Sequence, residues 1–285
     1  MKKLLAVLVV LALVFSVFAL SACGDVAEDL GEVYDYDAEE YVLELVEETE
    51  VCRFVTLSDE PIIPHGEPVF VPILMYHTSS EEPPRSPLPE LYVRPSEFER
   101  QLIWLNENNF TFITFDDWDN LNYIYNPIML TFDDGYLENY TEIFPLLQRH
   151  NARITLFLTV GLMDMHGLTE EMVRTMSDSG YVKFEAHSMT HPDLTTITAD
   201  SARMDSELRV ARERIEEMTG LPVLVLAYPA GQQNAAVREW TARYYRFGLR
   251  HEGGMHNTSV DDFGMLRIRI NRSTSLETFA RLVTR

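Results

Sequence analysis

The stretch that decides the fold is PIMLTFDDG, residues 127–135. An apolar, strand-favouring run follows Pro127, leads into the carboxylates of Asp133 and Asp134, and ends at a glycine. Such a run, short and bounded by turn residues, is typical of a strand buried on both faces. Two carboxylates this close resist joint ionisation unless a cation, a basic partner or a shared proton compensates them. The stretch therefore predicts a buried strand that carries, at its C-terminal end, either a reactive aspartate pair or only a polar turn.

Strand and helix patterns alternate seven or eight times along the chain. Expected strands cover residues 69–77, 111–115, 127–132, 154–160, 181–186, 223–228, 247–250 and 265–270. Expected helices begin at residue 96 and cover residues 137–150, 169–179, 198–219, 234–245 and 276–283. This alternation implies parallel strands with covering helices. Because there are too many units for a small open sheet, and no dinucleotide-binding glycine fingerprint, we predict an α/β fold, a barrel of β/α units. Such barrels carry their chemistry on loops at the C-terminal ends of the strands.

The N-terminus has the pattern of a bacterial lipoprotein signal. Lys2 and Lys3 precede an apolar segment, residues 4–20, and the sequence Leu-Ser-Ala then leads directly into Cys23. A cysteine in this position resembles a lipobox, in which it becomes the lipidated first residue. We therefore expect residues 1–22 to be removed and the protein to be lipid-anchored outside the cytoplasm. An ordinary signal peptide or an uncleaved membrane anchor is the alternative.

Charge and cysteine content narrow the class of protein further. The chain has 285 residues and a formal net charge of −22, which argues against nucleic acid as a partner. Residues 23–68 are rich in acids, with Arg53 their only Lys or Arg, as in an extended, self-repelling tether. If the first cysteine is lipidated, Cys52 has no disulfide partner. We expect a catalytic domain over residues 69–285.

Reactive residue types fall at the ends of the expected strands. They are His77, Asp133, Asp134, His187, His191 and Tyr228. Two histidines four residues apart can bind one metal ion from one side of a helical turn, and one added carboxylate leaves positions open for water and substrate. These ligand types suit zinc first, and also cobalt, nickel, manganese or iron. An isolated His-x-x-x-His is often only two polar loop residues, so its combination with Asp-Asp-Gly carries the argument.

Two motifs resemble those of a known enzyme family. Residues 131–135 (TFDDG) and 187–191 (HSMTH) look like the first two motifs of the polysaccharide deacetylases, carbohydrate esterase family four or NodB homology domain. The resemblance covers about residues 69–285 and implies a distorted (β/α) barrel, a divalent metal ion and removal of acetyl groups from N-acetylated sugars. By the family pattern, the metal ligands are Asp134, His187 and His191, and the general base is Asp133.

The departing amine also needs a general acid. The family usually supplies a histidine from a C-terminal Leu-x-His motif, but no histidine follows His256. Residues 73–77 (ILMYH) look instead like the N-terminal segment of the poly-N-acetylglucosamine deacetylase branch, which resembles a circular permutation with the acid histidine at the start. We therefore expect His77 to be the acid. The alternative is a structural histidine at a strand end.

The third motif departs from the family pattern. Many members have Arg-x-Pro-Tyr, whose arginine orients the base, whereas residues 226–231 (LAYPAG) place Ala227 and Ala230 at the arginine and tyrosine positions. The same branch also has Ala-Tyr-Pro, so the departure is partly expected. Tyr228 and the backbone N–H of Ala230 are candidates for contacts with substrate and oxyanion. Arg267, in a stretch resembling that branch's Leu-Pro-Arg-Ile, is a candidate for the missing guanidinium, with an ordinary strand-end arginine as the alternative.

The sequence thus predicts a lipid-anchored, metal-dependent de-N-acetylase of an extracellular N-acetylhexosamine polymer. The position of His77 favours a poly-β-1,6-N-acetylglucosamine-like exopolysaccharide, with peptidoglycan or another cell-surface glycan second. Two other classes stay open. One is a non-catalytic glycan-binding lipoprotein on a retained deacetylase fold, which the altered third motif favours. The other is a metal-dependent esterase or amidase acting on a small acylated molecule. The sequence carries no signal for the oligomeric state.

Overall fold

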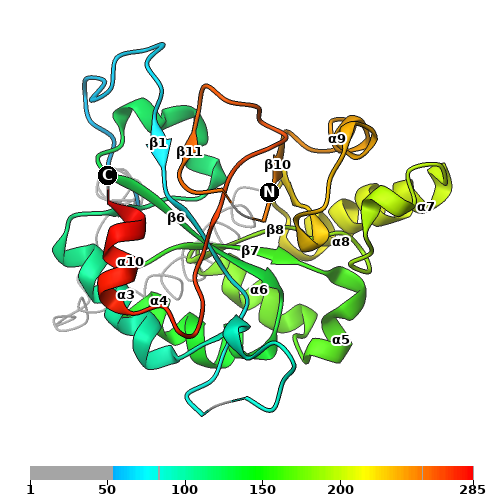
Figure 1. Ribbon diagram of the computed structural model, residues 1–285, viewed down its shortest axis with the longest axis horizontal. Helices are drawn as coiled ribbons and strands as arrows, with labels where there is room; N and C mark the ends of the chain where they lie inside the picture. The colour runs from blue at the N-terminus through cyan, green and yellow to red at the C-terminus, as the bar shows by residue number, and fades with distance from the viewer. Residues whose placement is uncertain (1–53, 83, 252, 285) are drawn as a thin grey trace, which may run out of the picture. The chain divides into compact units, whose positions relative to one another are not determined.

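A computed structural model provides the structure of the chain and describes residues 54–82, 84–251 and 253–284 (Figure 1). The expected signal peptide, the expected lipidation site at Cys23 and residues 24–53 of the expected tether lie outside the described residues. Among the residues that are described, no helix combines the length and the apolar character that a membrane span needs.

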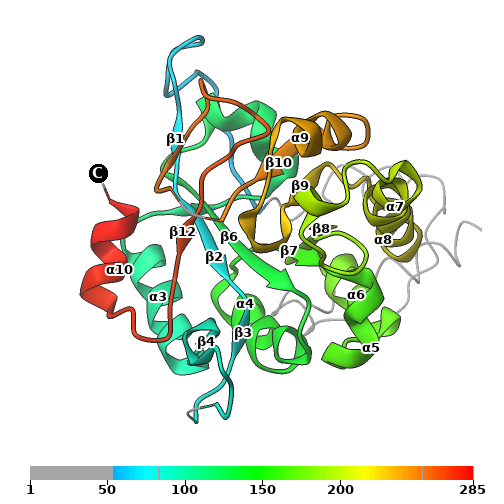
Figure 2. The same ribbon diagram turned by 45° about the vertical axis from the view of Figure 1, so that its right-hand side comes forward.

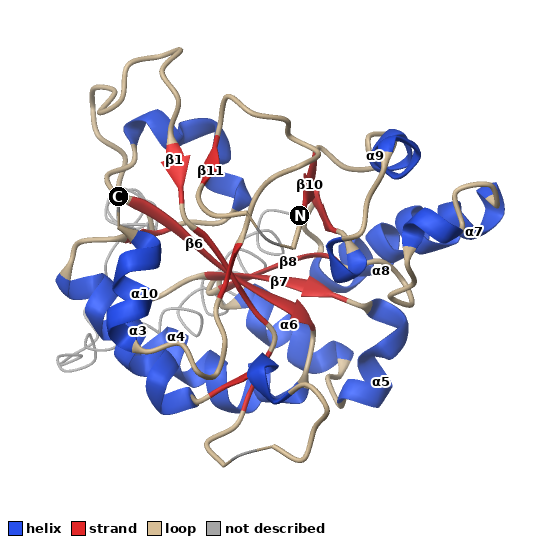
Figure 3. Cartoon of the chain, in the orientation of Figure 1, coloured by secondary structure: helices blue, strands red, loops and turns tan. Residues whose placement is uncertain are grey.

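Eight strands of the described chain form one sheet in which every pairing is parallel. In spatial order the sheet contains β10 (Phe247–Leu249), β9 (Val225–Ala227), β8 (Val182–Ala186), β7 (Ile154–Leu158), β6 (Pro127–Asp134), β2 (Ile73–Tyr76) and β12 (Ile268–Arg269). β5 (Thr111–Phe112) pairs with the first residues of β6. Figure 3 shows these strands crossing the middle of the domain with helices around them. The α/β class and the parallel sheet predicted from the sequence are confirmed.

The C-terminal segment connects the two edges of this sheet. Met265 bridges Leu249 of β10 in parallel, and β12 pairs with β2 at the opposite edge. Residues 265–269 therefore curl the sheet into a distorted barrel. Because Arg267 lies between these two pairings, the closure itself brings this residue into the barrel.

Successive strand residues face two different cores, as the period of a strand requires. On β6, Leu130 and Phe132 belong to the core shared with the helices, whereas Met129 belongs to a second core inside the barrel. Asp133 has the same parity as Met129 and so faces the interior. Both faces of β6 are buried up to Asp133, as its apolar sequence predicts.

Helices surround the sheet (Figures 1 and 2). The α-helices are α3 (Pro95–Glu107), α4 (Phe144–His150), α5 (Met163–His166), α6 (Glu170–Asp178), α7 (Ser201–Asp205), α8 (Ala211–Thr219), α9 (Ala235–Thr241) and α10 (Leu276–Val283). Two π turns, η3 (Asn139–Ile143) and η6 (Ser206–Val210), lead into α4 and α8. The 3₁₀ turns are η1 (Pro89–Leu91), η2 (Phe115–Tyr123), η4 (Val160–Leu162), η5 (Leu194–Thr196) and η7 (Pro229–Gly231). Short strand pairs join β1 (Phe70–Val71) to β11 (His256–Asn257) and β3 (Thr78–Ser79) to β4 (Tyr92–Val93).

Local side-chain chemistry sets several helix ends. Thr169, Asn234 and Ser275 each accept a hydrogen bond from the backbone N–H three residues later, which satisfies a free donor of the first turn. Gly220, at φ 69°, ends α8 in the left-handed conformation that glycine adopts without strain. These residues explain why the starts near 169, 234 and 276 and the end at 220 were readable from the sequence.

Three segments differ from the sequence expectation. The strand expected over residues 69–77 is divided at Pro72, whose carbonyl accepts from the N–H of Met129. The strand expected over residues 111–115 ends at Phe112, because Thr114 and Asp117 form a capping box that starts η2. Residues 54–68, expected to end the tether, pack on the domain: Val55 is buried, and backbone hydrogen bonds join this segment to η2.

Candidate active site

One cavity of about 380 Å³ lies at the C-terminal ends of the strands and gathers the predicted site residues of the described chain. Its lining consists of His77, Leu88, Leu91, Asp133, Asp134, Tyr136, Leu162, His166, His187, His191, Tyr228, Ala230, Gly231, His251, Arg267 and Arg269. Because parallel strands end together at one rim, residues from distant parts of the chain meet there, as expected for β/α barrels.

Asp134, His187 and His191 form a three-residue cluster with the geometry of a metal site. The Oδ1 atom of Asp134 lies 3.6 Å from Nε2 of His187 and 3.8 Å from Nε2 of His191. All three candidate ligand atoms lie within 4.8 Å of one another. Ligand atoms that each lie about 2.1 Å from one zinc ion are separated by roughly 3–4 Å. The donor set and its spacing therefore fit a divalent cation.

The tautomer of His187 also fits metal binding. Its Nδ1 lies 2.8 Å from the backbone oxygen of Ala227. Because a carbonyl only accepts, Nδ1 carries the proton and Nε2 presents its lone pair toward Asp134 and His191. Burial lowers the pKa of His187 despite the neighbouring aspartates, which favours the neutral imidazole that a metal requires.

The site loops adopt a backbone conformation that side chains rarely take. Among the described residues, seven other than glycine have positive φ, and three of these are asparagines, which tolerate it. We call residues 187–191, which carry both histidines, the histidine loop. The other four residues with positive φ border the cavity or lie in this loop: Asp134 (75°), Ser188 (63°), His191 (58°) and Ala230 (52°). Such strain gathers where function fixes the backbone. Here it lets adjacent strand-end residues such as Asp134 turn toward the histidines.

Glu207 holds the histidine loop from below. Its carboxylate accepts hydrogen bonds from the N–H groups of Met189 and Thr190, at 3.0 and 2.8 Å, and from the Thr190 hydroxyl at 2.5 Å. The carboxylate is buried on η6, where the helix widens into a π turn. The helix expected over residues 198–219 is rich in charged side chains, which are usually exposed, but Glu207 is buried. A signal existed, since this residue lies within the apolar stripe that includes Met204 and Ala211.

Asp133 and Arg267 form a buried, two-pronged ion pair. The guanidinium donates to Oδ1 at 2.7 Å and to Oδ2 at 2.8 Å, and it also donates to the backbone oxygen of Arg250. Burial alone would raise the pKa of Asp133, but the Arg267 charge holds it well below its usual range. Asp133 is thus an ionised carboxylate with a fixed orientation. It lies beside the three candidate metal ligands and is not one of them.

His77 lies next to this pair. Its Nε2 is 4.0 Å from Oδ2 of Asp133, and Asn139 donates to its backbone oxygen. Burial lowers the pKa of His77 to about 4, against the opposing effect of the aspartates. The cavity therefore places the candidate base Asp133, the candidate acid His77 and the three candidate metal ligands next to one another.

The third-motif residues divide between the cavity and the core. The hydroxyl of Tyr228 donates to the backbone oxygen of Phe263, and the side chain is fully buried, so this hydroxyl is not directed at a substrate. The expected contact from Tyr228 is therefore not supported for its hydroxyl. Ala230 lies in η7, and within the described chain its backbone N–H has no acceptor. That N–H remains available to a developing oxyanion.

Relatives of known type match this chain. Residues 120–246 match the sequence model of the family described as polysaccharide deacetylase. The crystal structure of BC0361, a polysaccharide deacetylase from Bacillus cereus, superposes with a TM-score of 0.71 at 31% identity, covering 76% of this chain and 70% of that chain. This chain belongs to the polysaccharide deacetylase family. The deacetylase is therefore a hydrolase of carbon–nitrogen bonds, as predicted, and the family acts on N-acetylated polysaccharides.

Two curated proteins of Bacillus subtilis (strain 168) are also similar. YxkH is 26% identical over 224 residues, which cover 76% of this chain and 77% of YxkH. Peptidoglycan-N-acetylmuramic acid deacetylase PdaA is 36% identical over 94 residues, which cover 33% of this chain and 34% of PdaA.

Several cavity residues of the deacetylase were not predicted. The ring of His166 stacks on Tyr136 at 4.4 Å between centroids, and its Nδ1 lies 3.3 Å from the backbone oxygen of Asp134. Leu88 comes from the loop after β3, and Arg269 from β12. Leu88 and Tyr136 lie in loops, whereas His166 ends α5 and Arg269 ends β12. No sequence motif marks any of the four, so only the folded chain shows that they line the site.

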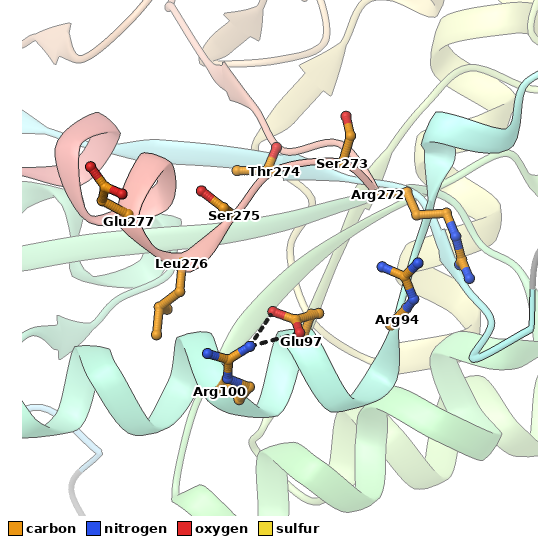
Figure 4. A pocket seen from close by; sticks show the side chains of 9 residues that line it. All are labelled: Arg94, Glu97, Arg100, Arg272, Ser273, Thr274, Ser275, Leu276 and Glu277. Atoms are coloured by element: carbon orange, nitrogen blue, oxygen red, sulfur yellow. Dashed lines mark hydrogen bonds and ion pairs between the residues drawn. The ribbon is translucent and has the colours of Figure 1, made fainter.

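A second cavity, of about 410 Å³, shows how the loop bearing Leu88 is held. It lies between the N-terminal ends of α3 and α10 and is lined by Arg94, Glu97 and Arg272, among others (Figure 4). From this cavity Arg272 donates to three backbone oxygens of residues 80–92. These bonds fasten the loop whose other side borders the active site.

Proposed function

We propose that the deacetylase is a lipid-anchored, metal-dependent enzyme that removes acetyl groups from an N-acetylhexosamine polymer outside the cytoplasm. One observation carries this proposal. Three candidate metal ligands lie within 4.8 Å of one another, directly beside a carboxylate that Arg267 keeps ionised. Zinc is the first candidate for the metal because two imidazoles and one carboxylate suit it, with cobalt, nickel, manganese and iron as alternatives.

The residues divide the reaction between them. A bound divalent cation would polarise the acetyl carbonyl and lower the pKa of a water molecule toward about 7. Asp133, held by Arg267 beside the ligands, accepts the proton of the attacking water. The N–H of Ala230 stabilises the negative charge that develops on the carbonyl oxygen. His77, protonated from solvent while Asp133 is still ionised 4.0 Å away, delivers that proton to the departing amine. The proton that Asp133 takes from the attacking water returns to solvent after the amine has left.

Two glycans are candidates for the polymer. The resemblance of residues 73–77 to the poly-N-acetylglucosamine deacetylase branch favours a poly-β-1,6-N-acetylglucosamine-like exopolysaccharide. Peptidoglycan is the second candidate, supported by the segment that is 36% identical to PdaA. For location, we propose acylation of Cys23, a tether that ends before residue 54 and a domain that includes residues 54–68.

Acetate release tests the proposed function. We would strip the metal from the soluble form, residues 24–285, refill it with one divalent ion at a time, and supply N-acetylglucosamine oligomers of β-1,4 and β-1,6 linkage. We expect release that a metal restores and that Asp133→Asn and His77→Ala abolish. The exposed His65→Ala and Asp119→Asn are matched controls that should keep full activity.

Other outcomes identify the competing classes. Glycan binding without acetate release under any metal would indicate a binding protein on a deacetylase fold. Release from soluble acetyl esters but from no oligomer would indicate an esterase for small molecules. Release that persists in His77→Ala would remove this histidine from the acid role.

A further inference from the structure

Arg269 is a cavity residue to which the reaction above assigns no role. It follows Arg267 by two residues, so the two side chains leave the same face of the strand, roughly 6.6 Å apart. β12 runs parallel to β2, whose C-terminal end leads to the rim. Arg269 therefore lies nearer the mouth of the cavity than Arg267, which is bound to Asp133 at the reacting centre.

Asn271 and His251 position the guanidinium of Arg269. Its Nε donates to Oδ1 of Asn271 at 3.0 Å, and its Nη1 donates to Nε2 of His251 at 3.2 Å, because a guanidinium has no acceptor. His251 in turn packs on Gly231, where an added Cβ would lie 2.1 Å from the His251 Cβ. Among the described residues, two of the five N–H groups of Arg269 are thus engaged and the other three have no acceptor there.

The charge of Arg269 has no carboxylate partner within the described residues. There, no Asp or Glu oxygen lies within 4.0 Å of its nitrogens, although acidic residues outnumber basic ones by 45 to 23 in the whole chain. The nearby carboxylate of Glu90 is already used, since it accepts from the N–H and the hydroxyl of Ser273. Glu90 interacts with Arg269 only through their charges, without a hydrogen bond between them. A guanidinium that is held in a substrate cavity without a carboxylate bound to it among the described residues is suited to bind an anion.

We propose that Arg269 binds a carboxylate of the substrate, and that the deacetylase acts on an acidic N-acetylated glycan. This inference rests on the proposed function and narrows its substrate class. The carboxylate is either a carboxyalkyl ether on the reacting sugar or part of a neighbouring hexuronic acid, since a planar guanidinium binds both in the same way. Poly-N-acetylglucosamine, which residues 73–77 favour, is neutral, so Arg269 places peptidoglycan ahead of it.

Four substrates test the inference with the metal-loaded protein. They are neutral N-acetylglucosamine oligomers, peptide-free peptidoglycan strands with free lactyl carboxylates, the same strands converted to methyl amides, and oligomers that alternate N-acetylhexosamine with hexuronic acid. One charged hydrogen-bonding group changes binding by about 10- to 100-fold. We expect kcat/KM to be higher by that factor for one of the two acidic substrates, mainly through KM. Which of them shows the gain identifies the source of the carboxylate.

Three variants assign that preference to Arg269. Arg269→Met should lower kcat/KM about 10- to 100-fold on the preferred acidic substrate and far less on neutral or amidated ones. Arg269→Lys should fall between, because it keeps the charge but loses the planar fork. Arg203→Met removes an exposed arginine that has no ion pair in the described chain and should leave all four rates unchanged. Metal content and thermal unfolding are measured for each variant.

Failure of the inference is distinguishable from failure of the proposed function. Equal rates on all substrates, or a loss in Arg269→Met that is the same for neutral and acidic glycans, would overturn the role of Arg269 and leave the deacetylase activity standing. Calorimetry also measures the affinity for the peptidoglycan strands and for their methyl amides, and this measurement does not depend on turnover. Arg269-dependent binding without acetate release would reject the proposed reaction and keep the subsite, whereas neither signal would reject both.

Discussion

Asp133 and Asp134 are adjacent in the chain, yet their surroundings give them two different states. Asp133 follows the strand alternation into the barrel interior and meets Arg267, whereas Asp134 turns toward two histidines in a left-handed conformation. In the sequence, the glycine that follows them is the residue best suited to a turn. The structure places positive φ on Asp134 itself as well as on Gly135, so the strain falls on the candidate ligand.

Removing the guanidinium at Arg267 should damage stability and activity together. Arg267→Met leaves Asp133 buried without its partner, and breaking a buried pair in this way costs about 3–5 kcal/mol. Arg246→Met is the control, because its pair with Asp119 is exposed and contributes less than about 1 kcal/mol. Urea unfolding of both variants at pH 7 measures the difference in the free energy of unfolding. Equal losses would show that the buried pair adds nothing to stability.

At the scale of elements, the sequence predicted strands from continuous apolar runs and helix ends from capping residues. It did not predict the points at which a strand or helix is locally interrupted. The apolar run before Asp133 identified β6 because a strand buried on both faces needs no alternation. The division at Pro72 and the early start of η2 depend on contacts with distant residues and on a two-residue capping box. The π turns were missed because a single inserted residue barely alters a 3.6-residue period.

One of those π turns carries a prediction. Glu207→Ala removes the carboxylate that holds the histidine loop, and changes to groups that orient ligands weaken metal binding about 10- to 100-fold. Glu207→Gln should lose less, because its amide oxygen can still accept from the N–H groups of Met189 and Thr190. Competition with a zinc chelator measures the affinity. Glu213→Ala, exposed on α8 and paired with Arg209, should bind zinc as wild type. If Glu207→Ala bound zinc as tightly as this control, the Glu207 carboxylate would not be needed to position the histidine loop.

At the scale of the whole molecule, the motifs indicated which residues react but not how Arg267 reaches them. The cluster of Asp134, His187 and His191 could be predicted from two short motifs, because all three residues lie within these motifs and each motif follows a single strand. Arg267 depends on a pairing between the last strand and both edges of the sheet. Arg269, in β12, depends on the same closure. Non-local pairing of this kind leaves no periodic trace in the sequence.

The boundary of the folded unit gives a prediction for the whole domain. Phe54 packs edge-on against Tyr181 at 5.0 Å between ring centroids, the guanidinium of Arg153 lies 5.1 Å from its ring centre, and Val55 is buried in the interior core. A chain that begins at residue 69 loses these contacts. Each buried apolar side chain contributes about 1.5–3 kcal/mol, so its Tm should lie roughly 5–15 °C below that of a chain beginning at residue 54. Val55→Ala in the longer chain should reproduce part of the loss. Calorimetry of the three proteins measures their melting temperatures. Identical values would show that residues 54–68 do not stabilise the domain and belong to the tether.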